Sequence, residues 1–216
     1  MTLEDAVTEL LRAAGLDPTS AELAETPRCV SELWRRDLLA GYQLDAATLL
    51  AETLPAAPGA DAIFAFDLAC HGLCPHHLVP FFGRAHLVYL PGDRLAGLGR
   101  LGQLVACYTQ RLTLQEHATL AIAEALVRHL GARGAGCVLE TTQLCLSLPD
   151  DRHRNSRVVT TAFVGALEQR GDLRERLLRG AGRSPQPSSL PSPLPSSTPS
   201  SAPSGGSPPP PSAPSG

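Results

Sequence analysis

Residues 70–85 read CHGLCPHHLVPFFGRA. The first eight of these residues contain two thiols and three imidazoles, from Cys70, His71, Cys74, His76 and His77. Sulfur and imidazole nitrogen are the ligands that zinc prefers in proteins, so this stretch predicts a zinc site. A structural site would take four protein ligands, whereas a catalytic site takes three and leaves one position for water.

A later cysteine, Cys145, is the candidate that completes the site. It lies on a strand predicted to begin near Gly136, and an antiparallel sheet could bring that strand back to the first loop. We predict a metal site of Cys74, His77 and Cys145 with an open fourth position. The alternative is that Cys145 is a small buried apolar residue, as free cysteines often are.

The segments around this stretch predict an α+β fold with a four-stranded antiparallel sheet and two helices on one face. Alternation of apolar residues, as in Ala85, Leu87 and Tyr89, indicates strands, and apolar residues at helical intervals indicate helices. The predicted strands cover residues 62–70, 83–92, 136–148 and 156–165. The predicted helices cover residues 98–110 and 114–130.

Two further regions flank this domain, which we place at residues 61–183. Residues 1–60 are predicted to be an N-terminal helical region, with helices over 3–14 and 26–39 and with Thr26 as the N-cap of the second. Residues 184–216 are rich in Pro, Ser and Gly and almost uncharged, which predicts a disordered tail.

Composition excludes several classes of protein. The net charge of −3 does not supply the basic field that a nucleic-acid-binding surface needs. No stretch approaches the roughly 20 apolar residues that cross a bilayer, and the N-terminus does not resemble a secretory signal. With six cysteines in 216 residues, a disulfide framework is not expected. We therefore expect a cytoplasmic protein with neither a membrane nor a nucleic acid as its partner.

Several separated motifs resemble the GTP cyclohydrolase I family. Residues 74–85, CPHHLVPFFGRA, resemble its C-E-H-H-L-x-P-F-x-G-K-A segment. Thr26-Pro27-Arg28 resembles the start of an upstream helix of the family. Other motifs follow in the family's order: Gly97-Leu98, Arg111 to Glu116, Leu144-Cys145 and Asn155-Ser156. The similarity covers residues 3–167.

This resemblance implies the tunnelling fold, in which the sheets of several subunits form a barrel and two rings stack into a homodecamer. It implies zinc held by Cys74, His77 and Cys145. The implied reaction is attack of zinc-activated water on C8 of the purine, which converts GTP and water to 7,8-dihydroneopterin triphosphate and formate. His76 is then the expected proton donor and acceptor, and Glu116, next to Gln115, the expected anchor of the purine.

The chain departs from the family where a second catalytic histidine and the triphosphate contacts are expected. Gln143 stands at the position of that histidine and cannot transfer a proton near neutral pH. Of the basic residues that hold the triphosphate, Arg100 alone is kept. The other positions are occupied by Cys29, Glu32, Gln103 and Pro149. We therefore predict a substrate smaller than GTP, such as a nucleoside, a purine base or an oxidised purine.

Two other interpretations remain open. A non-catalytic zinc-binding paralogue or regulatory subunit would also lack the second catalytic histidine, whose position Gln143 occupies, and the phosphate contacts. A purely structural zinc site would recruit Cys70 or His71 as a fourth ligand.

Overall fold

Strand β3 (Pro80–Leu90) is the centre of the fold in the computed structural model, which describes residues 1–149 and 151–183. It pairs on one side with β2 (Ile63–Leu73) and on the other with β5 (Gly134–Gln143). β6 (Val158–Gly165) pairs with β5, so the order is β2-β3-β5-β6 and all neighbours are antiparallel. The predicted four-stranded antiparallel sheet is therefore confirmed.

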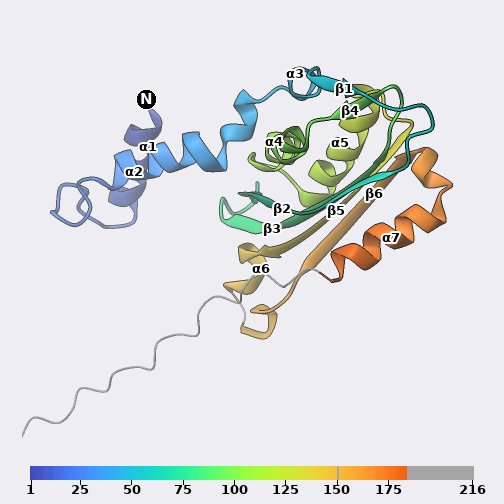
Figure 1. Ribbon diagram of the computed structural model, residues 1–216. Coiled ribbons are helices and arrows are strands. Elements are labelled where there is room, and N and C mark those ends of the chain that lie inside the picture. Colours follow the sequence, from blue (N-terminus) through green and yellow to red (C-terminus); the bar gives the residue numbers. More distant parts are fainter. Residues whose placement is uncertain (150, 184–216) are drawn as a thin grey trace, which may run out of the picture.

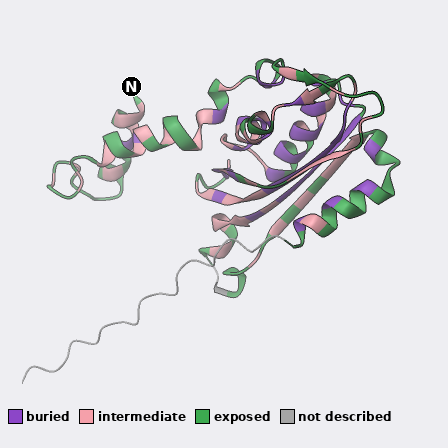
Figure 2. Cartoon of the chain, viewed as in Figure 1, coloured by how far each residue is buried: buried purple, intermediate pink, exposed green. Residues whose placement is uncertain are grey.

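Helices α4 (Leu98–Thr109) and α5 (Gln115–Arg128) cover one face of this sheet, as predicted (Figure 1). The main core lies between them and the sheet. Alternate residues of β3, namely Ala85, Leu87 and Tyr89, pack there with Leu104 of α4 and Ile122 of α5. Figure 2 shows the buried residues gathered on these facing surfaces.

The opposite face carries a helix that the sequence patterns did not predict, α7 (Gly171–Ala181) (Figure 1). Val88 and Leu90 of β3 pack in a second cluster with Leu173 and Leu177 of this helix. Most other residues of α7 are charged, so its apolar stripe is narrow. The stripe is nevertheless buried, because the sheet lies directly beneath the helix.

The N-terminal helices extend away from the sheet (Figure 1). They are α1 (Leu3–Ala13) and α2 (Thr26–Leu33), continued by the π-helical turn η1 (Trp34–Leu38) and the 3₁₀ turn η2 (Ala40–Gln43). The N-cap of α2 is Glu25 rather than the predicted Thr26, which is the first helical residue.

Short elements connect these regions and complete the described chain. α3 (Ala46–Leu49) packs into the main core through Ala46 and Leu49. β1 (Thr53–Pro55) pairs with β4 (Arg94–Ala96) in a two-stranded sheet. The remaining short helices are α6 (Leu144–Ser147), η3 (Asp151–His153) and η4 (Ala166–Glu168).

Two sequence predictions concern the chain ends and the membrane. The predicted disordered tail, 184–216, lies outside the described residues. Among the helices that the structure describes, none combines the length and the apolar character needed to cross a bilayer. The division of the chain at residue 60 stays a prediction.

The close contact between β3 and β5 predicts a strong effect of one glycine substitution. A Cβ at Gly83 would clash with the carbonyl oxygen of Glu140 and would lie 2.7 Å from Cα of Thr141. Because both neighbours are backbone atoms of a central strand, we expect Gly83→Ala to lower the free energy of unfolding by about 1–3 kcal/mol or more, measured by urea denaturation.

Gly99 provides the matched control, since a Cβ there meets nothing within 4 Å and the residue is helical. Gly99→Ala should be neutral or stabilising by up to about 1 kcal/mol. Equal stability of the two variants would contradict the pairing of β3 with β5.

Candidate metal centre

The loop between β2 and β3 is closed by its own backbone. Cys74 N donates to Val79 O at 3.0 Å, and Leu78 N donates to Cys74 O at 2.9 Å. Leu78 has a φ of 56°, a left-handed conformation that is costly for a branched residue. The loop is therefore held in one tight turn, with its first and last residues linked.

This turn brings the thiol of Cys74 and the ring of His77 together, with 3.6 Å between Sγ and Nδ1. Cys74 is buried, whereas His76 and His77 are exposed. Burial raises the pKa of the Cys74 thiol. Hydrogen bonds from the His77 ring and from the backbone amides of His76 and His77 outweigh that effect, so the pKa is lowered overall.

Cys145 reaches the same place from the end of β5, but not on a strand as predicted. β5 ends at Gln143, opposite Phe81 of β3, and Cys145 lies in the short helix α6. The next residue of β3 in that direction, Pro80, has no N–H to continue the ladder. The strand therefore ends there, although the alternation of Leu144, Leu146 and Leu148 resembles a strand.

The ligand atoms of Cys74, His77 and Cys145 all lie within 4.8 Å of one another. The bond lengths of tetrahedral zinc place neighbouring ligand atoms about 3.3–3.8 Å apart, so this donor set fits zinc with small adjustments. The sequence-predicted trio is thus brought together. Among the described residues, no fourth Cys, His, Asp or Glu belongs to the group.

Cys70 and His71, the predicted fourth ligands of a structural site, are part of β2 instead. Cys70 is buried in the main core, and burial raises the pKa of its thiol to about 12. Neither Cys70 nor His71 belongs to the group formed by Cys74, His77 and Cys145. The geometry favours three protein ligands.

The two thiols of the group do not ionise equally easily: the Cys145 thiol donates a hydrogen bond that helps to lower the pKa of Cys74, and the Cys74 thiolate then opposes the ionisation of Cys145. Burial raises the pKa of Cys145, and the neighbouring Cys74 thiol raises it further. A divalent cation between them removes this conflict, because it compensates both negative charges.

The first turn of α5 lies beside this group. Leu73, the residue before Cys74, donates its N–H to Arg111 O at 3.1 Å and accepts from Thr113 N at 3.2 Å. Glu116 follows within the first turn of α5, and its side chain is exposed. The same end of the sheet therefore carries the thiols, His76 and the carboxylate of Glu116.

Gln115 and Gln143 also come together, through a hydrogen bond of 2.7 Å from Gln143 Nε2 to Gln115 Oε1. Thr141, which the sequence analysis did not single out, donates to the same oxygen at 2.6 Å. The signal that points to it is its spacing, because residues 141 and 143 of one strand share a face.

Arg100 lies away from the group within this subunit. It is on the first turn of α4, where it donates to Gln103 at 2.8 Å and pairs with Glu52. The other end of α4, at Thr109, lies against Gly72 near the end of β2, so about 14 Å of helix separates Arg100 from that end.

Comparison with known proteins identifies the relatives of this chain. The model of the family described as GTP cyclohydrolase I matches residues 3–181. The chain is 43% identical over 176 residues to GTP cyclohydrolase 1 of Ralstonia nicotianae, covering 82% of this chain and 84% of that protein. It is 41% identical over 180 residues to the protein of the same name from Chromobacterium violaceum, covering 83% of this chain and 87% of the relative. GTP cyclohydrolase 1 of Deinococcus radiodurans is 34% identical over 174 residues, covering 81% and 79%.

The geometry predicts that metal retention depends on Cys145. Loss of residues that only orient a metal ligand costs 10–100-fold in affinity, so Cys145→Ala should lower zinc affinity by more than about 100-fold. The measurement is a competition titration of the metal-free protein with a chromophoric chelator.

Cys107→Ala is the matched control, since Cys107 is buried in the main core and outside the group. Its zinc affinity should equal that of the parent protein. An unchanged affinity in Cys145→Ala would exclude this residue as a ligand.

Proposed function

Because the chain belongs to the GTP cyclohydrolase I family, we propose that it is a metal-dependent hydrolase that opens the imidazole ring of a guanine compound at C8. The family's reaction converts GTP and water to 7,8-dihydroneopterin triphosphate and formate. One observation carries the proposal: the ligand atoms of Cys74, His77 and Cys145 lie within 4.8 Å of one another at one end of the sheet.

Zinc is the metal that this donor set favours, with Cys74, His77 and Cys145 as its ligands. When bound, it would supply a Lewis acid that makes water a nucleophile near neutral pH. A reducing, cytoplasmic location is part of the proposal, because thiols are kept reduced there, and all six cysteines of the chain are free.

Two exposed side chains have the chemistry for the remaining roles. His76 follows Cys74 by two residues, and its ring lies edge-on to the ring of His77 at a centroid distance of 6.2 Å. An imidazole there can donate and accept protons near neutral pH. Glu116 can accept two parallel N–H groups from the guanine edge, which would orient C8 toward the metal ligands.

A homo-oligomer, a decamer by resemblance, is also part of the proposal. Two features support it: β2 and β6 are the outer strands of the sheet, and Leu10 and Leu33 of the N-terminal helices are 67% and 51% exposed. Arg100, which lies away from Cys74 in its own subunit, would then approach the site of a neighbour.

Sedimentation equilibrium tests this assembly. We expect a mass several times that of the 22.7 kDa chain. A single-subunit mass at micromolar concentration would contradict the assembly and the role of Arg100.

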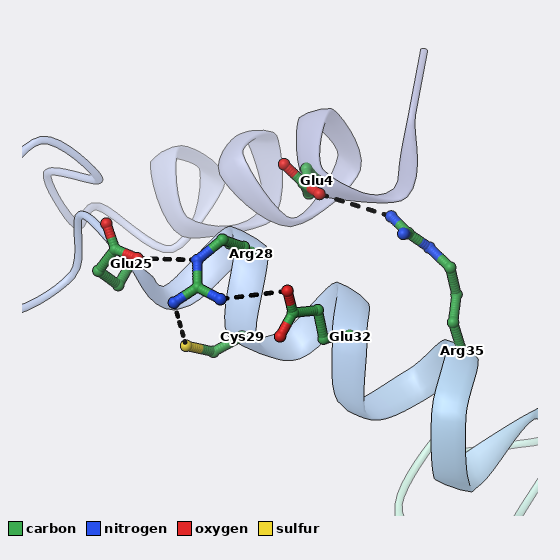
Figure 3. A network of polar contacts seen from close by, with 6 residues as sticks. All are labelled: Glu4, Glu25, Arg28, Cys29, Glu32 and Arg35. Atoms are coloured by element: carbon green, nitrogen blue, oxygen red, sulfur yellow. Dashed lines mark hydrogen bonds and ion pairs between the residues drawn. The ribbon is translucent and has the colours of Figure 1, made fainter.

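The predicted substrate smaller than GTP is not supported by the relatives, which are named GTP cyclohydrolase 1. We keep it as a second candidate because of one observation on α2. Arg28 donates to Glu25 at 2.9 Å and to Glu32 at 3.1 Å, so its charge is already compensated (Figure 3). Arg100 is likewise paired with Glu52.

The energetic consequence for a triphosphate is large. Each hydrogen bond to a charged group is worth about 1.5–3 kcal/mol, so loss of any two of the four basic positions now occupied by Cys29, Glu32, Gln103 and Pro149 would weaken binding by about 10²–10⁴-fold. A nucleoside or base would lose none of this energy.

One assay tests both the proposed ring-opening activity and the choice between GTP and a smaller substrate. The zinc-loaded full chain is incubated separately with GTP, guanosine, guanine and an 8-oxopurine, and purine absorbance, formate and pterin fluorescence are followed. Purine absorbance is the readout for the 8-oxopurine, because hydrolytic removal of its C8 gives carbon dioxide and not formate. We expect formate from at least one guanine compound. The second candidate requires a kcat/KM for guanosine at least equal to that for GTP.

His76→Ala is the matched variant for the chemical step. It should lower kcat by about 10²–10⁴-fold at unchanged zinc content, because a general acid–base is lost. A kcat/KM for GTP above that for guanosine would remove the second candidate. Unchanged purine absorbance together with absence of formate for every compound would favour the non-catalytic paralogue and refute the proposed activity.

A further inference from the structure

A buried amide network joins the start of α5 to the end of β5. Gln115, the first residue of α5, is only 4% exposed. Its Nε2 donates to the backbone carbonyls of Leu139 and Val158, each at 3.0 Å. Leu139 belongs to β5 and Val158 to β6, so one side-chain amide ties the helix to two strands.

These two carbonyls decide which way the amide points. A carbonyl oxygen can only accept, so both N–H groups of Gln115 must face them, and Oε1 must face the other way. That oxygen accepts from Thr141 Oγ1 at 2.6 Å and from Gln143 Nε2 at 2.7 Å. All four hydrogen-bonding positions of the Gln115 side chain are thus occupied within the protein.

The direction of the hydrogen bonds is also defined at Gln143. Its Nε2 donates to Thr141 Oγ1 at 3.0 Å as well as to Gln115, so its two N–H groups are both directed into the network. Its backbone oxygen accepts from Ser147 Oγ at 3.2 Å, across the first turn of α6. Both the side chain and the carbonyl of Gln143 are therefore held.

We infer that Gln115 and Gln143 are positioning residues for the metal group: the side-chain amide of Gln115 has no position left to bind a substrate, and both side-chain N–H groups of Gln143 are used within the network. Gln143 is the last residue of β5, and Cys145 follows two residues later in α6. Pro80 ends the strand at Gln143, and the hydrogen bonds of Gln143 then fix the orientation of the turn that carries the Cys145 thiol relative to Cys74. The inference rests on the proposed metal site, which it deepens.

The hydrogen bonds to α5 give this arrangement a second fixed point. The backbone around Leu73 is paired with Arg111 and Thr113, just before α5 begins. The start of α5 is therefore linked to the Cys74 loop through the main chain and to the Cys145 turn through the Gln115 side chain. A single helix start thus holds both thiols, and buried polar groups left without partners would penalise other arrangements.

Cobalt titration of the metal-free full chain tests the inference. Partners that orient metal ligands contribute 10–100-fold to metal affinity, so Gln115→Leu should raise the cobalt Kd by that factor. It should also change the intensity and position of the visible cobalt bands, because the Cys145 ligand is displaced. Gln143→Leu should do the same, and the double variant should lose little more than either single variant.

Thr119→Val is the matched control. Thr119 is 1% exposed on the same helix, and its hydroxyl lies 2.6 Å from Thr160 Oγ1 of β6 and donates to the backbone oxygen of Gln115 at 2.6 Å. The variant removes these two buried hydrogen bonds but none of those made by the side-chain amides of Gln115 and Gln143. It should lower stability while leaving the cobalt Kd and spectrum as in the parent.

Gln143 is partly exposed, so we expect Gln143→Leu to fold even if Gln115→Leu does not. Gln143→Leu then tests the positioning role by itself. A cobalt Kd and spectrum in Gln143→Leu equal to those of the parent would overturn the positioning role while leaving the metal site intact. A parent protein that binds neither cobalt nor zinc would refute the metal site and the inference together.

Discussion

The pairing of β3 with both of its neighbours is the constraint on which the candidate site depends. Phe81 lies opposite Gly72 on one side and opposite Gln143 on the other. This register brings the end of β2 and the end of β5 to the same edge of the sheet, although Cys74 and Cys145 are far apart in the chain. A slip of one residue in either pair would turn the side chains of a strand to the opposite face and separate the thiols.

The metal group lies where regular elements end, and each of them is held by hydrogen bonds. The Cys74 loop is closed on itself, the Cys145 turn is fixed through Gln143, and α5 is attached to both. Such support from strands and a helix holds ligands more accurately than mobile loops do. The left-handed Leu78 is consistent with this, because strained residues persist where the surroundings overdetermine them.

The arginines considered for substrate binding do not lie where the metal ligands lie. The thiols, His76 and Glu116 belong to one end of one subunit, whereas Arg100 and the N-terminal helices lie elsewhere. In the N-terminal helices Arg28 is bound by two carboxylates (Figure 3). Arg28 and Arg100 are thus both paired with carboxylates away from the metal group, so neither offers its charge to a substrate without giving up such a pair.

Local patterns in the sequence were sufficient for the four strands of the sheet, for the helices that became α4 and α5, and for the pair Cys74 and His77. For Cys145 the sequence left two interpretations open, and the tertiary structure brings its thiol to the pair. Alternation and helical spacing report which face of an element is apolar, and a dense group of thiols and imidazoles reports its chemistry directly. The end of β5, the helix α7 and the burial of Gln115 were decided only by the tertiary structure. Pro80 on a different strand stops the ladder at Gln143, the sheet gives the narrow stripe of α7 a surface to cover, and carbonyls of Leu139 and Val158 occupy the Gln115 amide. Each of these depends on a partner distant in the chain, which no local spacing can identify.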